Sequence, residues 1–197
     1  MKKMNLVRFV TLAMLLAVAL VLGLTNIGII PIPPANVTTM HIPVIIGTIV
    51  CGLGDGMVLG LAFGLVSVWK AFTATSSLVG PLMAESPVLV IIMSVGARLM
   101  VPVVTHFVYK AFKKKTVGIA IAAAAGTLTN TVCYLGLMLL FYTLTGLDSG
   151  ALLGVITGVG ALNGSLEAVA AVLLCTPIAT AVGKIVNKEV TVEHAKD

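Results

Sequence analysis

Residues 88–93 read VLVIIM and residues 44–53 read VIIGTIVCGL, two runs in which apolar and polar positions do not alternate. A strand of a membrane β-barrel alternates the two kinds of residue over about ten positions, whereas a helix in lipid is apolar on every side. Lipid offers no hydrogen-bond partners, so only helices and closed barrels can cross a bilayer. The two runs therefore predict membrane-spanning helices.

The composition of the whole chain agrees with this interpretation. Hydrophobic residues make up 59% of the 197 residues and charged residues 10%, and the mean hydropathy is +1.15. A soluble domain is about half apolar and about a quarter charged. The length predicts one compact bundle, a single domain over residues 1–197. The net charge of +5 does not indicate nucleic-acid binding, because the basic residues stand at the ends of apolar runs.

Six spans are predicted, over residues 8–24, 41–53, 56–70, 86–109, 116–145 and 158–184. Three prolines between residues 25 and 40 exclude a regular helix there. The sequence Gly54-Asp55-Gly56 predicts a tight turn between the second and third spans. The start of the chain resembles a signal peptide, but its small-residue triplet at 17–19 lies in the middle of the apolar run. We therefore expect an uncleaved first span and an all-α membrane fold.

The distribution of lysine and arginine predicts the orientation. With six spans nearly all basic residues near span ends fall on one side, which places both termini in the cytoplasm and the protein in the plasma membrane. These residues are Lys2, Lys3, Arg8, Lys110, Lys113, Lys114, Lys115, Lys184 and Lys188, and only Lys70 falls on the other side. The segments 25–40, 71–85 and 146–157 are then extracellular, so any site that they form opens outward.

Four polar residues inside predicted spans are candidates for one shared site, since an ionisable group there costs at least about 2.5 kcal/mol and so needs a partner or a task. They are Arg98 in the fourth span, Asn130 in the fifth, and Asn163 and Glu167 one turn apart in the last. In one interpretation Arg98 binds a carboxylate or phosphate and the two asparagines bind hydroxyl or amide groups. In the other, Arg98 and Glu167 form a structural ion pair and the asparagines connect helices. A free Arg98 favours an anionic ligand, and a paired one favours a neutral polar ligand.

Further candidates for ligand binding lie at the expected outer ends of the spans. Each also has a purely structural interpretation, as a helix cap, a loop residue or, for the tryptophan, an interfacial anchor. They are Asn36, Thr38, His41, Trp69, Ser76 and Ser77.

No motif predicts an enzyme, a metal site or a cofactor. Cys51, Cys133 and Cys175 lie in apolar stretches without CxxC spacing, and catalytic arrangements of serine, histidine or paired carboxylates are absent from the sequence. The sequence also has no Walker motif, so ATP-driven transport requires a partner. Ala13 and Ala17 form a small-xxx-small step on the first span, which permits close approach of another helix. That helix belongs either to a partner or to the bundle itself.

The chain resembles the substrate-binding S components of energy-coupling factor (ECF) vitamin transporters. The resemblance rests on residues 39–47 (TMHIPVIIG) and 60–65 (GLAFGL), on the size and expected six spans, and on the Ala13–Ala17 step. It implies a vitamin held near the outer face, a transmembrane coupling subunit that contacts Ala13 and Ala17, and two cytoplasmic ATPase subunits.

Residues 34–43 (PANVTTMHIP) are most similar to S components of the pantothenate type. Pantothenate has a carboxylate, hydroxyls and an amide, which suit Arg98, Asn130 and Asn163, whereas Glu167 needs a cation or a ligand hydroxyl beside it. Other relatives are described as carrying a hydroxymethylpyrimidine or a B6-type ring. From a different class, a stand-alone intramembrane enzyme or scaffold with an Arg98–Glu167 pair is the alternative.

Overall fold

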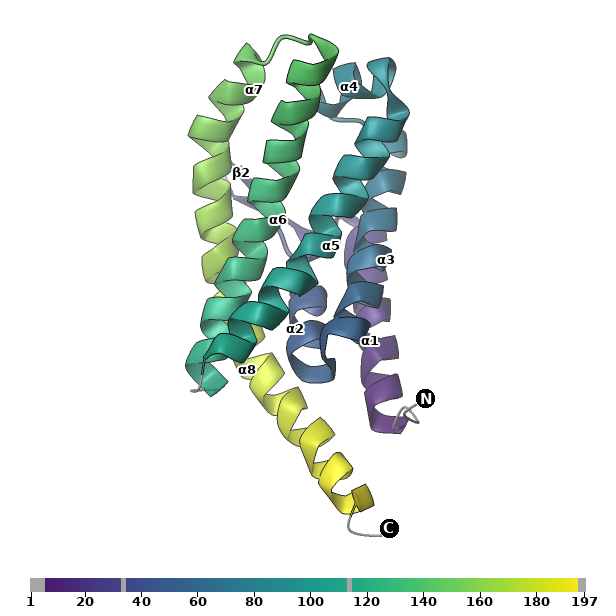
Figure 1. Ribbon diagram of the computed structural model, residues 1–197, viewed down its shortest axis with the longest axis vertical. Helices are drawn as coiled ribbons and strands as arrows, with labels where there is room; N and C mark the ends of the chain where they lie inside the picture. Colours follow the sequence, from purple (N-terminus) through teal and green to yellow (C-terminus); the bar gives the residue numbers. More distant parts are fainter. Residues whose placement is uncertain (1–5, 33–34, 113–114, 195–197) are drawn as a thin grey trace.

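The computed structural model describes residues 6–32, 35–112 and 115–194 and shows helices bundled along one long axis (Figure 1). Five helices are long and apolar enough to cross a membrane, so the protein is a helical membrane protein. These candidate spans are Leu6–Leu24, Leu53–Thr73, Pro87–Ala111, Thr116–Thr145 and Leu162–Val186. They lie where the first, third, fourth, fifth and sixth spans are predicted.

Only short elements connect the long helices in the described part of the chain. In chain order they are α1 (Leu6–Leu24), a 3₁₀ turn (Asn26–Gly28), β1 (Ile29–Ile32), β2 (Ala35–Thr38), α2 (Ile42–Cys51), α3 (Leu53–Thr73), α4 (Val79–Glu85), α5 (Pro87–Ala111), α6 (Lys115–Thr145), α7 (Gly150–Val155), a π-helical segment (Ile156–Gly160) and α8 (Ala161–His194).

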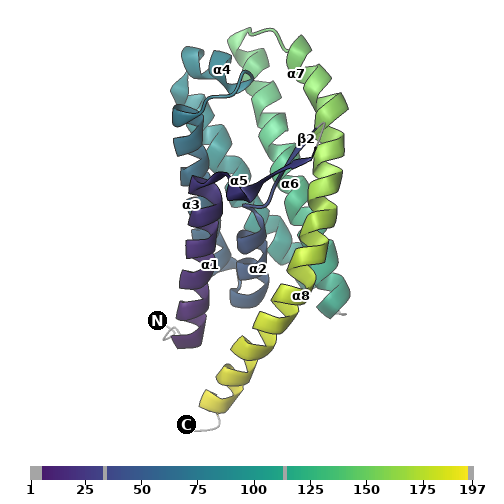
Figure 2. The same ribbon diagram turned by 180° about the vertical axis from the view of Figure 1, so that it is seen from behind.

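The second predicted span, residues 41–53, is not found as a complete crossing. Helix α2 has ten residues and is about 15 Å long, half of the roughly 30 Å hydrocarbon core. The β1–β2 hairpin precedes it and lies between α1 and α8 at mid-height of the bundle (Figure 2). Antiparallel pairing from Ile29 opposite Thr38 to Ile32 opposite Ala35 gives hydrogen-bond partners to the backbone groups on the facing edges of the two strands. The sequence predicted an all-α fold, and the structure differs from it by this short hairpin.

The start of α1 and the end of α8 lie at the same end of the bundle, here called the near end (Figure 1). The hairpin and α2 together return the chain from mid-height to the near end, and α3 then runs to the opposite, far end. This course agrees with an even number of passes. Which end faces the cytoplasm stays a prediction.

Several local features differ from the sequence prediction. The turn before α3 lies at Gly52, whose φ of 94° suits glycine, and Gly54, Asp55 and Gly56 fall in the first turn of α3. The helix dipole stabilises a carboxylate in that position. Asp55 also accepts a 2.6 Å hydrogen bond from Nε of Arg8 on α1. Residues 71–85 include the short helix α4, residues 146–157 include α7, and α8 continues past residue 184 to His194.

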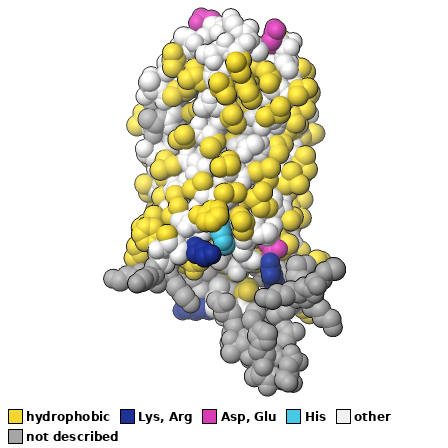
Figure 3. Space-filling view, in the orientation of Figure 1, with side chains coloured by type: hydrophobic (Ala, Val, Ile, Leu, Met, Phe, Trp, Pro, Cys, Tyr) yellow, Lys and Arg dark blue, Asp and Glu magenta, His cyan; other side chains and the backbone are white. Residues whose placement is uncertain are grey.

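The surface visible in Figure 3 is apolar over most of its height. The charged side chains visible on that face lie toward the two ends of the bundle. Large apolar side chains such as Val132 on α6 and Leu173 on α8 are 66% and 68% exposed in the isolated chain. Such a band fits a lipid environment, since lipid covers apolar surface that water would not.

The buried apolar residues form two clusters rather than one. The near-end cluster surrounds α2 and includes Val44, Ile45 and Phe63. The far-end cluster lies among α4, α5, α6 and α7 and includes Leu82 and Met138. Polar side chains that must be buried can therefore gather at mid-height, where one cluster gives way to the other.

Helices α3 and α5 approach each other closely along a glycine face of α3. Gly56, Gly60 and Gly64 are four residues apart, the spacing that lets helix backbones meet in membranes. A Cβ atom on Gly60 would lie 3.0 Å from the backbone oxygen of Arg98, and one on Gly64 would lie 3.1 Å from Cα of Val95. This close contact, here called the α3–α5 seam, therefore fixes the position of the part of α5 that carries Arg98.

Replacing Gly60 with alanine tests this seam. The new methyl group meets backbone atoms that cannot rotate away, so we expect Gly60→Ala to lower stability by about 1–3 kcal/mol relative to its control. The control is Gly136→Ala on α6, which makes the same gain in helix propensity and has no atom within 4 Å of the added Cβ. The midpoint of thermal unfolding in detergent measures both, and equal midpoints would contradict the close approach.

Candidate substrate-binding site

Arg98 lies near the middle of α5 and contacts both apolar clusters. Its guanidinium carbon is 5.2 Å from the ring centroid of Phe63 on α3 and 4.3 Å from that of Tyr134 on α6. Phe63 belongs to the near-end cluster and Tyr134 packs against the far-end cluster. The two rings give the cation an electrostatically favourable place in the buried interior. Cation–π contacts leave the N–H groups of the guanidinium available.

Two nitrogen atoms of Arg98, Nε and Nη1, are enclosed by protein and have no hydrogen-bond partner among the described residues. An unpartnered buried charge is costly, because a group taken from water loses its hydration without compensation. Arginine presents its donors as a planar fork that matches a carboxylate or phosphate. The side chain is therefore suited to an acceptor that comes from outside the protein.

Glu167 on α8 holds the β1–β2 hairpin. Its Oε1 atom accepts hydrogen bonds from the backbone nitrogen of Thr38 at 2.8 Å and from the Thr38 hydroxyl at 2.7 Å. The carboxylate is 6% exposed, so these bonds form in a place that water barely reaches. This contact joins the end of β2 to the last helix across 129 positions of sequence.

Arg98 and Glu167 lie close enough to interact electrostatically but do not form an ion pair within 4.0 Å. Within the described part of the chain that distance is met only by Arg8 and Asp55, at 2.6 Å. The structural pair considered for Arg98 and Glu167 is therefore not a direct contact. Glu167 offsets part of the charge of Arg98 while its Oε1 atom binds Thr38.

Three more polar side chains, on segments that also carry or contact the groups described above, have enclosed atoms. His41, directly before α2, is fully buried, interacts electrostatically with Arg98 and has no partner for either ring nitrogen among the residues described. The side-chain oxygens of Asn130 on α6 and Asn163 on α8 are likewise enclosed and unpaired within the described structure. Buried polar atoms are normally hydrogen-bonded. Unpaired atoms from the residue before α2 and from α5, α6 and α8 therefore indicate an interior prepared for a polar ligand.

Three of the remaining predicted site residues are exposed at the surface. Trp69 is half exposed on α3, as an interfacial anchor would be. Ser76 and Ser77 are exposed between α3 and α4, and Ser76 Oγ accepts a 3.3 Å hydrogen bond from the backbone nitrogen of Val79, a local contact at the start of α4. Asn36 belongs to β2, but its side chain lies outside the described residues.

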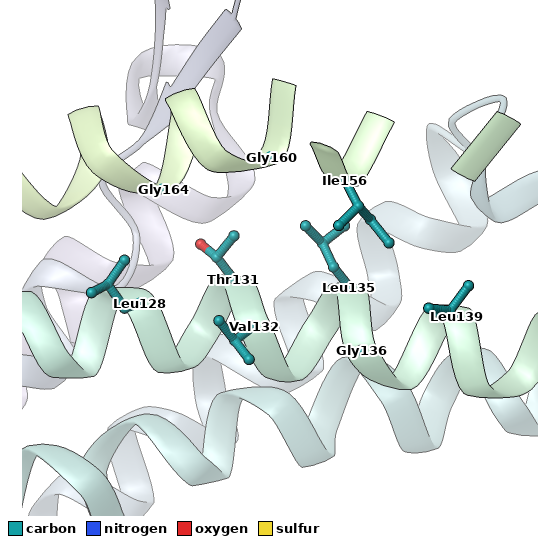
Figure 4. A pocket seen from close by; sticks show the side chains of 9 residues that line it. All are labelled: Leu128, Thr131, Val132, Leu135, Gly136, Leu139, Ile156, Gly160 and Gly164. Atoms are coloured by element: carbon teal, nitrogen blue, oxygen red, sulfur yellow. The ribbon is translucent and has the colours of Figure 1, made fainter. Parts of the chain in front are cut away.

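An apolar pocket of about 340 Å³ lies outside this polar group, between α6 and the segment that leads into α8 (Figure 4). Its lining residues are Leu128, Thr131, Val132, Leu135, Gly136, Leu139, Ile156, Gly160 and Gly164. The lining carries no charge and one hydroxyl, so it cannot recognise a charged or multiply polar molecule. The pocket suits hydrocarbon and is not the site for a polar ligand.

The small residues of α1 divide into two groups. Ala19 and Gly23 are buried, and a Cβ on Gly23 would lie 2.6 Å from Cγ1 of Val66 on α3. Ala13 and Ala17 are exposed. The bundle therefore uses Ala19 and Gly23 for its own packing and leaves the Ala13–Ala17 step uncovered.

Comparisons with known proteins agree with this architecture. The family described as "ECF transporter, substrate-specific component" matches residues 6–179. The chain belongs to this family. It is therefore a transporter subunit of the plasma membrane with several spans, rather than an enzyme.

Two curated relatives are similar over most of this S component. The pantothenic acid transporter PanT of Lactococcus lactis subsp. cremoris is 36% identical over 199 aligned positions, which cover 95% of this chain and 99% of the relative. The pantothenate transporter PanT of Leuconostoc mesenteroides subsp. mesenteroides is 26% identical over 168 positions, covering 80% of this chain and 79% of the relative.

Phe63 and Tyr134, whose rings contact the guanidinium of Arg98, are not among the site residues predicted from the sequence. Tyr134 follows Asn130 by one helical turn and so shares its face of α6, which is a signal that the spacing offered. Phe63 gave no such signal, because an aromatic residue in an apolar span is ordinary core composition. Its role depends on the distance between α3 and α5.

The contact between Thr38 and Glu167 predicts a specific effect on stability. Thr38→Val removes the hydroxyl donor beside a buried carboxylate and keeps the side-chain volume, so we expect a loss of about 1.5–3 kcal/mol. Thr38→Ser keeps the donor and serves as the control, with a smaller loss. Thermal unfolding of the purified S component in detergent measures both variants. A valine variant as stable as the serine variant would show that the hydroxyl contributes nothing.

Proposed function

We propose that this S component is the high-affinity binding subunit for uptake of pantothenate. The observation that carries the proposal is the buried guanidinium of Arg98, whose Nε and Nη1 atoms have no protein acceptor among the described residues. The names of the two PanT relatives support pantothenate as the ligand. The family supports uptake of a vitamin.

The groups around Arg98 match the functional groups of pantothenate. The carboxylate binds the guanidinium fork of Arg98 between Phe63 and Tyr134. The amide and hydroxyl groups reach the unpaired side-chain atoms of His41, Asn130 and Asn163. Each of these contacts would replace a missing hydrogen bond, so ligand binding removes the cost of several buried unpaired groups at once.

Glu167 fits this ligand despite its negative charge. Arg98 lies near enough to offset the carboxylate, and two bonds from Thr38 occupy its Oε1 atom. The remaining oxygen, Oε2, can accept a bond from a ligand hydroxyl. Glu167 therefore acts on the hydroxyl end of the ligand and Thr38 holds the hairpin beside it.

The far end of the bundle is the extracellular end in this proposal. Both termini then lie in the cytoplasm, and the whole chain of 197 residues acts as one binding domain. The vitamin enters from outside and is held at mid-height, between the two apolar clusters. Trp69, Ser76 and Ser77 line the outer surface and make no contact with the bound vitamin.

Release to the cytoplasm uses partners. The exposed Ala13–Ala17 step on α1 gives a transmembrane coupling subunit a place for close helix contact, and two cytoplasmic ATPase subunits supply the energy. The loaded S component then tips in the membrane and opens its site inward. The alternatives are an S component for a hydroxymethylpyrimidine or B6-type ring, and a scaffold in which the same buried groups have a structural task.

Binding of labelled pantothenate to the purified S component tests the proposed ligand. We expect saturable binding that Arg98→Gln weakens at least about 30-fold, because truncating one partner of a buried charge pair costs about 2 kcal/mol or more. Ser77→Ala, at an exposed position between α3 and α4, is the control and should bind like the wild type. If the wild type ignores pantothenate and binds a neutral vitamin ring, the ligand assignment is wrong and the transporter family still holds.

The proposed partner surface makes a separate prediction. Ala13→Leu and Ala17→Leu should abolish uptake into cells while pantothenate binding stays within about twofold, because bulky side chains block close helix approach on an exposed face. Ala84→Leu, exposed on α4 at the far end, is a matched control that should keep both activities. Loss of binding together with uptake would place the two alanines in the bundle's own packing instead.

A further inference from the structure

Lys70, near the far end of α3, carries a buried ammonium group that the proposed site does not use. Its Nζ atom is enclosed by protein and has no hydrogen-bond partner within the described ranges. A lysine near a span end usually extends to the membrane interface, where water and lipid headgroups solvate its charge. Lys70 instead keeps its charged end inside the protein, although it lies in the last turn of the helix.

The position of Lys70 on α3 connects it with Arg98. Phe63, Ser67 and Lys70 follow at intervals of four and three residues, so they lie on the same helix face. Phe63 and Ser67 are buried, and the Phe63 ring contacts the guanidinium of Arg98. Lys70 therefore follows the arginine contact by seven residues, about 10 Å along the helix toward the far end.

The buried charges of the described interior do not balance. Arg8 and Asp55 compensate each other in a direct ion pair near the other end of α3. Of the remaining buried groups, Arg98 and Lys70 are cations and Glu167 is the anion that lies near Arg98. Two positive charges and one negative charge leave one positive charge without a counterion. In a poorly screened interior this excess attracts a monoanion.

We propose that Lys70 is a specificity-determining residue that makes the site select an anionic ligand over a neutral one of the same shape. This inference rests on the proposed function. In it, the preference for an anionic ligand depends on the net charge of the buried groups together and not on Arg98 alone. Arg98 orients the carboxylate through its fork, and Lys70 supplies the charge that leaves the occupied interior neutral.

Equilibrium binding of two ligands to the full-length S component in detergent tests the role of Lys70. The ligands are pantothenate and pantothenyl alcohol, in which a hydroxymethyl group replaces the carboxylate. The variants are Lys70→Gln, which removes the charge and keeps a polar side chain, and Lys70→Arg, which keeps the charge. The rise of about 10 Å along α3 from Phe63 to Lys70 sets the scale of the separation between the ammonium group and the ligand. Over that distance, with an effective dielectric constant of about 20, the lost attraction corresponds to roughly a tenfold change in affinity.

We expect Lys70→Gln to weaken pantothenate binding about tenfold and to leave the affinity for pantothenyl alcohol within about twofold. Lys70→Arg should retain the preference of the wild type for the anion. Equal weakening of both ligands by Lys70→Gln would assign Lys70 a structural role and overturn the inference, as would unchanged binding of both.

The same experiment separates this inference from the proposed function. If the wild type and the Lys70→Gln variant bind pantothenate with the same affinity, only the role of Lys70 is overturned. A wild type that binds neither pantothenate nor pantothenyl alcohol overturns the proposed ligand as well. Binding of the neutral alcohol by the glutamine variant also shows that the variant is folded.

Discussion

The close contact between α3 and α5 is the constraint on which the rest of the structure depends. Glycines on α3 let the two backbones meet at the residue that carries the buried guanidinium, because a side chain at Gly60 would strike the carbonyl oxygen of Arg98. This contact brings Phe63 over the cation. Helix α6 then adds Tyr134 from the other side. A polar centre in lipid is thus held by backbone packing and not by an ion pair.

Two apolar clusters with a polar layer between them explain how a vitamin-binding subunit can be both stable and hydrophilic inside. The clusters around α2 and among α4–α7 bury the side chains that stabilise the bundle. The layer between them includes buried groups at His41, Arg98 and Asn130 that have no hydrogen-bond partner among the described residues. Because unpaired buried groups are costly, the empty protein is held in a less favourable state than the loaded one. That difference is a source of affinity.

The long helices were predictable because apolar runs of span length leave few alternatives in lipid. Arg98, Glu167, Asn130 and Asn163 could be named as candidates because polar residues in such runs are rare, and the structure shows that their polar atoms are enclosed. The β1–β2 hairpin was not, since prolines exclude a helix without specifying strand pairing. The turn at Gly52 and the aromatic contacts of Phe63 and Tyr134 depend on distances between helices, which no local pattern encodes. The bond from Thr38 to Glu167 joins residues 129 positions apart.

The hairpin that replaces half of the second span makes one part of the interior adjustable on its own. Its two strands pair with each other, and Thr38 at the end of β2 is tied to α8 through Glu167. The glycine contact between α3 and α5 involves neither of these two residues. A substitution at Thr38 therefore alters the link between the hairpin and the last helix and leaves in place the contact that positions Arg98.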